Sequence, residues 1–362
     1  MKKEFMEIVK AFANNGVYTL NEKTECVEFS VANSKMLDIS DISEDMVFNS
    51  NVNSLRAPKI TIHDRTMLLL IAKYGVLNFR DLRQAFRLRS EIEKETCAYV
   101  FGSNSELKNI IDGRLTNKGL VVRCRIYQEY KENEEILRQH EYIYCVTAKG
   151  INVVNSCMGC KFKDSNSFRM MNDTNTRDKI SRMAAAHIAL YLARYGFNVL
   201  ENHYSLVVKN NRERYTLLMY NEKKNIEVML QPLYLFRNPQ IETEVEFSEK
   251  VKTLVNDVFR WVTCESEFEV KGERAERKVV LVCNSIMEYN QFCNVLIDYF
   301  SLRDYFGYIG SIYATSVGMV DSSTTVKEVF YRHIDIQQED DRMVPVGGEL
   351  SCFFSDEDKI IK

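Results

Sequence analysis

The chain has 362 residues, a formal net charge of -3 and a hydrophobic fraction of 45%. This length is sufficient for two or three domains with sizeable cores, and the composition is typical of globular proteins. No apolar run reaches the roughly 18 residues that a membrane-spanning helix needs, and the N-terminal MKKEFMEIVKAF lacks the apolar core of a secretion signal. We therefore expect a cytoplasmic protein without a membrane partner.

The charge is unevenly distributed along the sequence. Residues 56–150 contain 17 Lys and Arg against 12 Asp and Glu, whereas residues 1–55 and 151–362 each carry a net charge of -4. A basic segment within an acidic chain indicates a nucleic-acid-binding face more strongly than the overall charge does.

Residues 1–55 are expected to form a small N-terminal region and a linker. The pattern predicts a helix near Lys3–Asn14, followed by two short alternating segments, VYTL and CVEFSV. The polar stretch SDISEDMVFNSNVNSLRAP is rich in turn-forming residues and indicates the linker.

Residues 56–154 predict a winged helix-turn-helix domain. Apolar residues between Ile62 and Tyr74 have helical spacing, and Gly75 ends this first helix. The segment LNFRDLRQAFRL predicts a second helix, with Asn78 as its cap. An acidic segment then lengthens the usual turn before a third helix, which Gly119 terminates.

An exposed basic hairpin, the wing, is expected after the third helix. Leu120–Tyr130 and Arg138–Val146 alternate as two strands joined by the charged tip KENEE. Thr147-Ala-Lys-Gly-Ile then predicts a short helix that closes onto the core.

The third helix and the wing are the expected contacts to duplex DNA. An α-helix fits the major groove, where Lys and Arg reach phosphates or guanine edges and Asn can read adenine. The candidates on the third helix are Asn104, Lys108, Asn109, Arg114, Asn117 and Lys118. Those on the wing are Arg123, Arg125, Lys131 and Arg138. The alternatives are that these are ordinary solvated side chains, or that the domain contacts a protein.

Residues 155–176 are expected to be a polar linker that contains Cys157 and Cys160. Two thiolates at this spacing can hold one edge of a zinc tetrahedron, but the sequence offers no second pair of ligands. We predict no metal site here.

Residues 177–336 predict an α/β domain with a mixed sheet, followed by an acidic tail at 337–362. The order of its elements resembles a degenerate restriction-endonuclease-like fold. Such nucleases hold a metal with an acid on one strand and Glu-X-Lys on the next. Glu227 occupies the Glu position, but Met229 stands where the Lys would be, and Glu213 lies only at the edge of the preceding strand. We predict no catalytic residues, and the absence of GxxxxGK and GxGxxG argues against a nucleotide cofactor.

The segments Gly119-Leu-Val and Thr147-Ala-Lys-Gly, followed by a linker and a degraded endonuclease-like domain, resemble the replication-relaxation family. These are winged-helix DNA-binding proteins of Firmicutes plasmids and integrative elements. The likeness covers roughly 90 residues of the winged-helix half; in the second domain only the order of the elements matches. The resemblance implies a role in replication or mobilisation of a mobile element.

The sequence therefore favours a non-enzymatic protein that binds double-stranded DNA through a winged helix. The α/β domain is expected to form a homodimer or to recruit replication or transfer proteins. One alternative is a transcriptional regulator whose α/β domain senses an effector. A second alternative is a metal-dependent nuclease.

Overall fold

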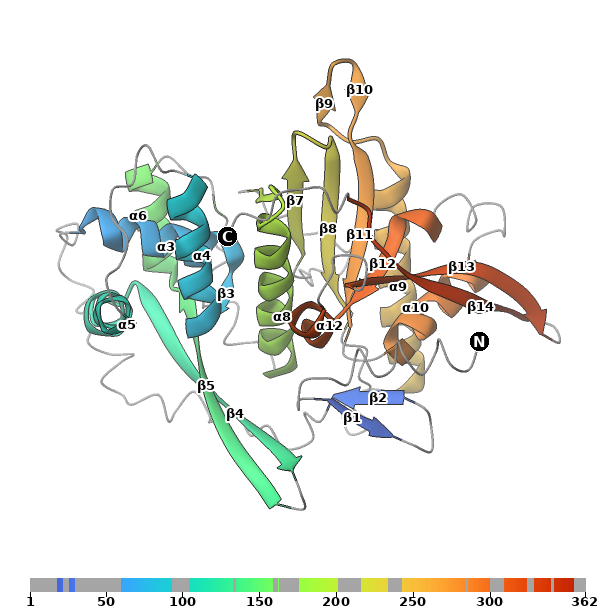
Figure 1. Ribbon diagram of the computed structural model, residues 1–362, viewed down its shortest axis with the longest axis horizontal. Coiled ribbons are helices and arrows are strands. Elements are labelled where there is room, and N and C mark those ends of the chain that lie inside the picture. The colour runs from blue at the N-terminus through green and yellow to red at the C-terminus, as the bar shows by residue number, and fades with distance from the viewer. Residues whose placement is uncertain are drawn as a thin grey trace. The chain divides into compact units, whose positions relative to one another are not determined.

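The computed structural model describes residues 18–21, 26–29, 60–92, 104–132, 135–158, 162, 176–200, 216–233, 243–283, 286–299, 309–323, 329–339 and 342–354. It is a mixed α/β structure that divides into two compact units (Figure 1). The helical unit includes the described residues from Ile60 to Leu200, and the sheet unit includes the described residues before 30 and from Thr216 onward. Within the described ranges, no helix has the length and hydropathy to cross a membrane.

The helical unit combines helices with a three-stranded antiparallel sheet of order β3-β5-β4. Its elements are α3 (Ile62–Tyr74), β3 (Val76–Asn78), α4 (Phe79–Ile92), α5 (Asn104–Lys108), the π-helix η2 (Asn109–Thr116), β4 (Val121–Glu132), β5 (Glu135–Val146), α6 (Ala148–Met158), α8 (Thr176–Ala193) and β6 (Asn198–Val199). The helices and the two hairpin strands predicted for this part of the chain are confirmed as elements. The strand β3 was not predicted.

Local capping explains where the first two helices begin. Thr61 and Asp64 form a reciprocal capping box at the start of α3. Gly75, with φ of 82°, ends α3 in the left-handed region that favours glycine. The Asn78 side chain accepts a hydrogen bond from the Asp81 amide at 2.7 Å, which confirms Asn78 as the cap of α4.

The third helix changes from α to π geometry at Asn109. Its buried residues come in adjacent pairs five positions apart, Ile110 with Ile111 and Leu115 with Thr116. A π-helix has a wider turn than an α-helix, so this spacing keeps both pairs on the core side. The Thr116 hydroxyl also donates to the Ile111 carbonyl at 2.8 Å, five residues earlier.

A junction of backbone groups joins the end of the third helix to the start of α6. The Thr147 hydroxyl donates to the Gly119 carbonyl at 2.8 Å and accepts from the Gly150 amide at 3.0 Å. The Thr147 amide donates to the Leu120 carbonyl at 3.0 Å. At Gly150, a Cβ atom would lie less than 3.0 Å from both the Leu120 carbonyl oxygen and the Val146 side chain. The segments Gly119-Leu-Val and Thr147-Ala-Lys-Gly are therefore joined by hydrogen bonds and by close backbone packing.

Helix α8 belongs to the helical unit, where it packs against α4 and β3. His187 Nδ1 lies 2.7 Å from Asp81 Oδ1, and both side chains are buried. The boundaries drawn from the sequence assigned this helix to the α/β domain instead, because its apolar residues do not reveal which neighbour they cover.

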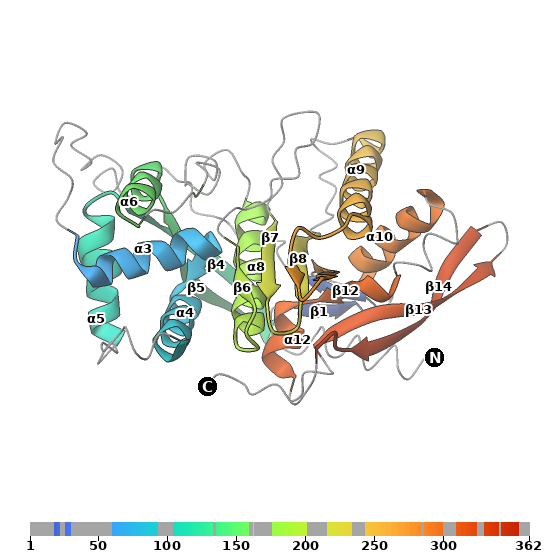
Figure 2. The ribbon, with the colours of Figure 1, turned by 90° about the horizontal axis from the view of Figure 1, so that it is seen from above.

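The sheet unit is built on a mixed sheet that includes the strand order β14-β13-β12-β11-β8-β7. Strands β8, β11 and β12 run parallel, and the outer pairs are antiparallel. Helices α9 and α10 pack against each other (Figure 2), and α9 also packs against β11. Its elements are β1 (Tyr18–Asn21), β2 (Cys26–Phe29), β7 (Leu217–Asn221), β8 (Ile226–Pro232), α9 (Glu244–Thr263), β9 (Glu269–Val270), β10 (Glu273–Arg274), β11 (Glu276–Val282), α10 (Ile286–Tyr299), the 3-10 helix η4 (Ile309–Ser311), β12 (Ile312–Thr315), α12 (Val317–Ser322), β13 (Phe330–Glu339) and β14 (Arg342–Ser351).

Two expectations about the ends of the chain have different outcomes. The alternating segments VYTL and CVEFSV are confirmed as strands β1 and β2, while the helix expected near Lys3–Asn14 lies outside the described residues. The acidic tail expected at 337–362 is wrong for Arg342–Ser351, which pairs with β13. Glu339, one of the acidic residues that suggested a tail, is the last residue of β13.

We expect Gly150→Ala to lower the free energy of unfolding by about 1–3 kcal/mol, because the added methyl group meets the backbone at Leu120. Denaturant unfolding measures this change. Gly113→Ala is the matched control, since its Cβ would meet only the side chain of Asn109, at 2.7 Å, which can rotate away. The control should stay within about 1 kcal/mol of wild type. Equal effects of the two substitutions would contradict the role of the junction.

Candidate nucleic-acid interface

The third helix presents polar side chains on its exposed side. Asn104, Lys108, Asn109 and Asn117, all predicted as DNA contacts, are exposed. The side-chain amide of Asn117 donates a hydrogen bond to the Gly113 carbonyl at 2.7 Å, four residues earlier. This side of the helix therefore offers amide groups and one ammonium group, the side-chain types that read base edges and contact phosphates.

Lys108 also connects the third helix to the beginning of α4. Its Nζ lies 5.3 Å from the centroid of the Phe79 ring, in a cation–π contact. Phe79 is the first residue of α4, so the exposed side of the third helix meets the first turn of α4 at this point.

Arg114 and Lys118, also predicted as DNA contacts, form ion pairs with a buried acid. Asp64 is fully buried at the start of α3, with Arg114 Nη2 at 3.0 Å and Lys118 Nζ at 3.4 Å. The Arg114 and Lys118 side chains remain 36% and 29% exposed. A buried carboxylate needs such compensation, so these two cations have a structural role in addition to any contact with DNA.

Arg123 connects strand β4 to the third helix. Its Nη1 lies 3.3 Å from Asp112 Oδ2, and its guanidinium lies 4.8 Å from the Tyr142 ring centroid. Burial and the neighbouring Asp112 carboxylate raise the pKa of the Tyr144 hydroxyl, which keeps that group neutral. The Arg123 charge is thus balanced by Asp112 within the unit.

The remaining wing candidates are Arg125, Lys131 and Arg138. The first two lie on β4 and the third on β5, and Glu129 is the register partner of Arg138. Their side chains lie outside what the structure describes.

Sequence reasoning missed a second basic surface, on α4. Arg80, Arg83 and Arg87 are exposed, whereas Leu82 and Ala85 are buried on the other side of the helix. The signal was present in the spacing of three and four residues, which places all three arginines on one side.

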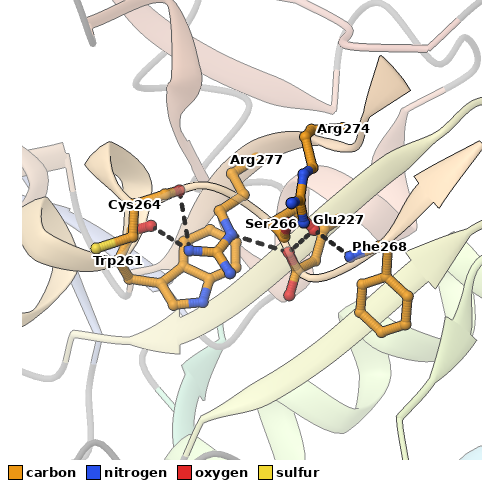
Figure 3. Close-up of polar contacts among 7 residues, drawn as sticks. All are labelled: Glu227, Trp261, Cys264, Ser266, Phe268, Arg274 and Arg277. Carbon is orange, nitrogen blue, oxygen red and sulfur yellow. Dashed lines mark hydrogen bonds and ion pairs between the residues drawn. The ribbon is translucent and has the colours of Figure 1, made fainter. Parts of the chain in front are cut away.

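Glu227, the candidate nuclease carboxylate in the sheet unit, is held by an arginine and a serine (Figure 3). Arg277 Nε lies 2.9 Å from Glu227 Oε2, and the Ser266 hydroxyl donates to the same oxygen at 2.7 Å. Glu227 and Arg277 are register partners on the parallel strands β8 and β11. Both side chains are largely buried, so the pair neutralises a charge that would be costly alone.

Arg277 also closes the C-terminal end of α9. Its Nη1 donates to the carbonyl oxygens of Trp261, at 2.9 Å, and Cys264, at 3.0 Å. Its guanidinium lies 4.7 Å from the Trp261 ring centroid, which Figure 3 shows beside it. A cation at the C-terminal end of a helix also interacts favourably with the helix dipole. The cluster therefore ties β8, β11 and α9 together.

Two further residues that bear on metal chemistry, Met229 and Cys157, lie within the described ranges. Met229 is buried on β8, and Glu213 lies outside the described residues. Cys157 is in the last turn of α6, and Cys160 also lies outside the described residues. Among the residues that the structure describes, no group of three His, Cys, Asp or Glu side chains is arranged to hold a metal ion.

No family model matches the sequence, and comparison with curated proteins and with solved structures found no match.

We expect Arg277→Met to lower the free energy of unfolding by about 3–5 kcal/mol, because it leaves the buried Glu227 carboxylate without a counter-charge. The double substitution Glu227→Gln with Arg277→Met should lose less, since no charge then remains buried. Chemical denaturation measures both, with exposed Lys223→Met as a control near wild type. A cost for the single variant no larger than for Lys223→Met would show that the pair is not structural.

Proposed function

We propose that the helical unit is a winged helix that binds duplex DNA, and that the chain acts as a non-enzymatic DNA-binding protein. The observation that carries this proposal is the exposed side of the third helix, with Asn104, Lys108, Asn109 and Asn117. In a helix-turn-helix protein the corresponding helix enters the major groove.

The order of elements supports the winged helix. Three helices are interrupted by a short strand after the first, and a two-stranded hairpin follows the third. The hairpin strand β5 lies centrally in the sheet, between β3 and β4, which anchors the hairpin to the helices. A hairpin of this length extends beyond the three-residue strand β3, as a wing must.

The ion pairs refine which residues are assigned to contact DNA. Lys108 and the exposed asparagines are the leading contacts to bases and phosphates. Arg114 and Lys118 together carry one more positive charge than Asp64 removes, so they still contribute attraction to the phosphates. Arg123, Arg125, Lys131 and Arg138 remain candidates for backbone contacts from the wing.

For the sheet unit we propose a role in dimerisation or in binding replication or transfer proteins. Its nuclease-like order of elements, with β8 and β11 parallel around α9, is compatible with a degenerate restriction-endonuclease-like fold. The Glu227 carboxylate forms an ion pair with Arg277 and accepts a hydrogen bond from the Ser266 hydroxyl, so it has a structural role. A role in plasmid or mobile-element replication rests on the family resemblance, and a transcriptional regulator is the alternative.

We expect the protein to bind a random-sequence duplex of about 30 bp, roughly three helical turns, and Lys108→Gln with Asn109→Ala to weaken binding about tenfold. The physical reason is the loss of one phosphate contact and one amide that reads a base edge. Fluorescence anisotropy with labelled duplex measures the Kd.

The matched control is Lys223→Gln with Asn294→Ala, which removes the same types of exposed side chain from the sheet unit. Arg114 is avoided because its loss would leave Asp64 uncompensated and confuse binding with stability. Selection of genomic fragments by the wild-type protein then separates an origin-binding role from a promoter-binding role. Equal affinity of both double variants would refute the assigned face.

Incubation of supercoiled plasmid with the protein and Mg²⁺ or Mn²⁺ should leave the plasmid uncut. The reason is that Arg277 and Ser266 already satisfy Glu227 Oε2, and Met229 offers no amine to activate water. Agarose gel electrophoresis detects nicked and linear forms. Cleavage that Glu227→Ala abolishes, in a variant that remains folded, would overturn the non-enzymatic assignment.

A further inference from the structure

A row of arginines follows the exposed side of α4. Arg80, Arg83 and Arg87, hereafter the α4 arginine stripe, are all exposed and are separated by three and four residues. These separations place side chains above one another on a helix. From Arg80 to Arg87 the helix rises about 10 Å, a length over which one strand of duplex DNA presents several phosphates.

The acid within this segment is turned away from the stripe. Asp81 is fully buried, and its Oδ1 is 2.7 Å from His187 Nδ1 on α8. The carboxylate closest in sequence to the arginines is therefore on the core side of α4. Between Arg80 and Arg87, the exposed residues of α4 are the three arginines, whose charge type suits a polyanion.

The stripe begins where α4 meets the third helix. Lys108 on the third helix lies over the Phe79 ring, and Phe79 precedes Arg83 by one helical turn. Lys108 and the α4 arginine stripe therefore form a row of cationic side chains that extends from the proposed base-reading helix onto α4.

We propose that the α4 arginine stripe binds the sugar–phosphate backbone of the same DNA duplex that the third helix reads. This inference rests on the proposed function and identifies a surface that adds to it. Arginine is suited to the task because its guanidinium donates two parallel hydrogen bonds to phosphate oxygens. Phosphate contacts position the protein and carry no sequence information. The stripe thus supplies affinity, while the third helix supplies the choice of site.

The test is the salt dependence of binding to a random-sequence duplex of about 30 bp, measured by anisotropy from about 50 to 200 mM KCl. The variant Arg80→Gln, Arg83→Gln, Arg87→Gln should bind about 10- to 100-fold more weakly at the lower salt concentrations. The slope of log K against log salt should become shallower by about 3, close to one unit per lost contact. The variant Arg80→Lys, Arg83→Lys, Arg87→Lys keeps the charges and should retain most of the slope.

A control for net charge alone is Lys223→Gln, Lys250→Gln, Lys271→Gln, which removes three exposed cations from the sheet unit. It should leave the slope unchanged, and circular dichroism melting should show all three triple variants folded. A glutamine stripe variant with the wild-type affinity and slope would overturn the inference while the proposed function stands. A wild-type protein that does not bind duplex DNA would overturn both.

Discussion

The helical unit depends on the close approach between the end of its third helix and the start of α6. Thr147 bonds to Gly119, Leu120 and Gly150 through its own backbone and hydroxyl groups, and Gly150 leaves the space that this approach needs. Because Leu120 leads directly into β4 and Thr147 directly follows β5, the junction also sets where the hairpin leaves the helices. Movement of this contact would shift the third helix and the hairpin together.

Buried acids decide which cations are available to a partner. Asp64 is compensated by Arg114 and Lys118, and Glu227 is compensated by Arg277, since a carboxylate removed from water requires a counter-charge or hydrogen-bond donors. Arg114 and Lys118, predicted from the sequence to contact DNA, and Glu227, the candidate nuclease carboxylate, therefore also have structural roles. Lys108 and the α4 arginine stripe, by contrast, are exposed.

The elements that follow a local rule were predictable from the sequence. The capping residues Thr61 and Asn78 and the glycine turns mark helix ends through short-range geometry, and the alternating residues of β4 and β5 mark the hairpin. Strand β3 has only three residues, too few for a period to show, and it exists because β5 pairs with it. Strand β14 was missed for a similar reason, since its partner β13 and the Arg332–Glu349 ion pair stabilise a segment whose surroundings are acidic.

By itself, the sequence determined the helices and the β4–β5 hairpin of the helical unit, the concentration of positive charge in residues 56–150 and the presence of Glu227 without a neighbouring lysine. These properties depend on residues close together in the chain. Only the tertiary structure decided that Asp64 lies beneath Arg114, that Glu227 faces Arg277, and that α8 packs against α4 through His187. Each of these contacts joins residues at least 50 positions apart, and burial makes their charges interact more strongly than local sequence can indicate.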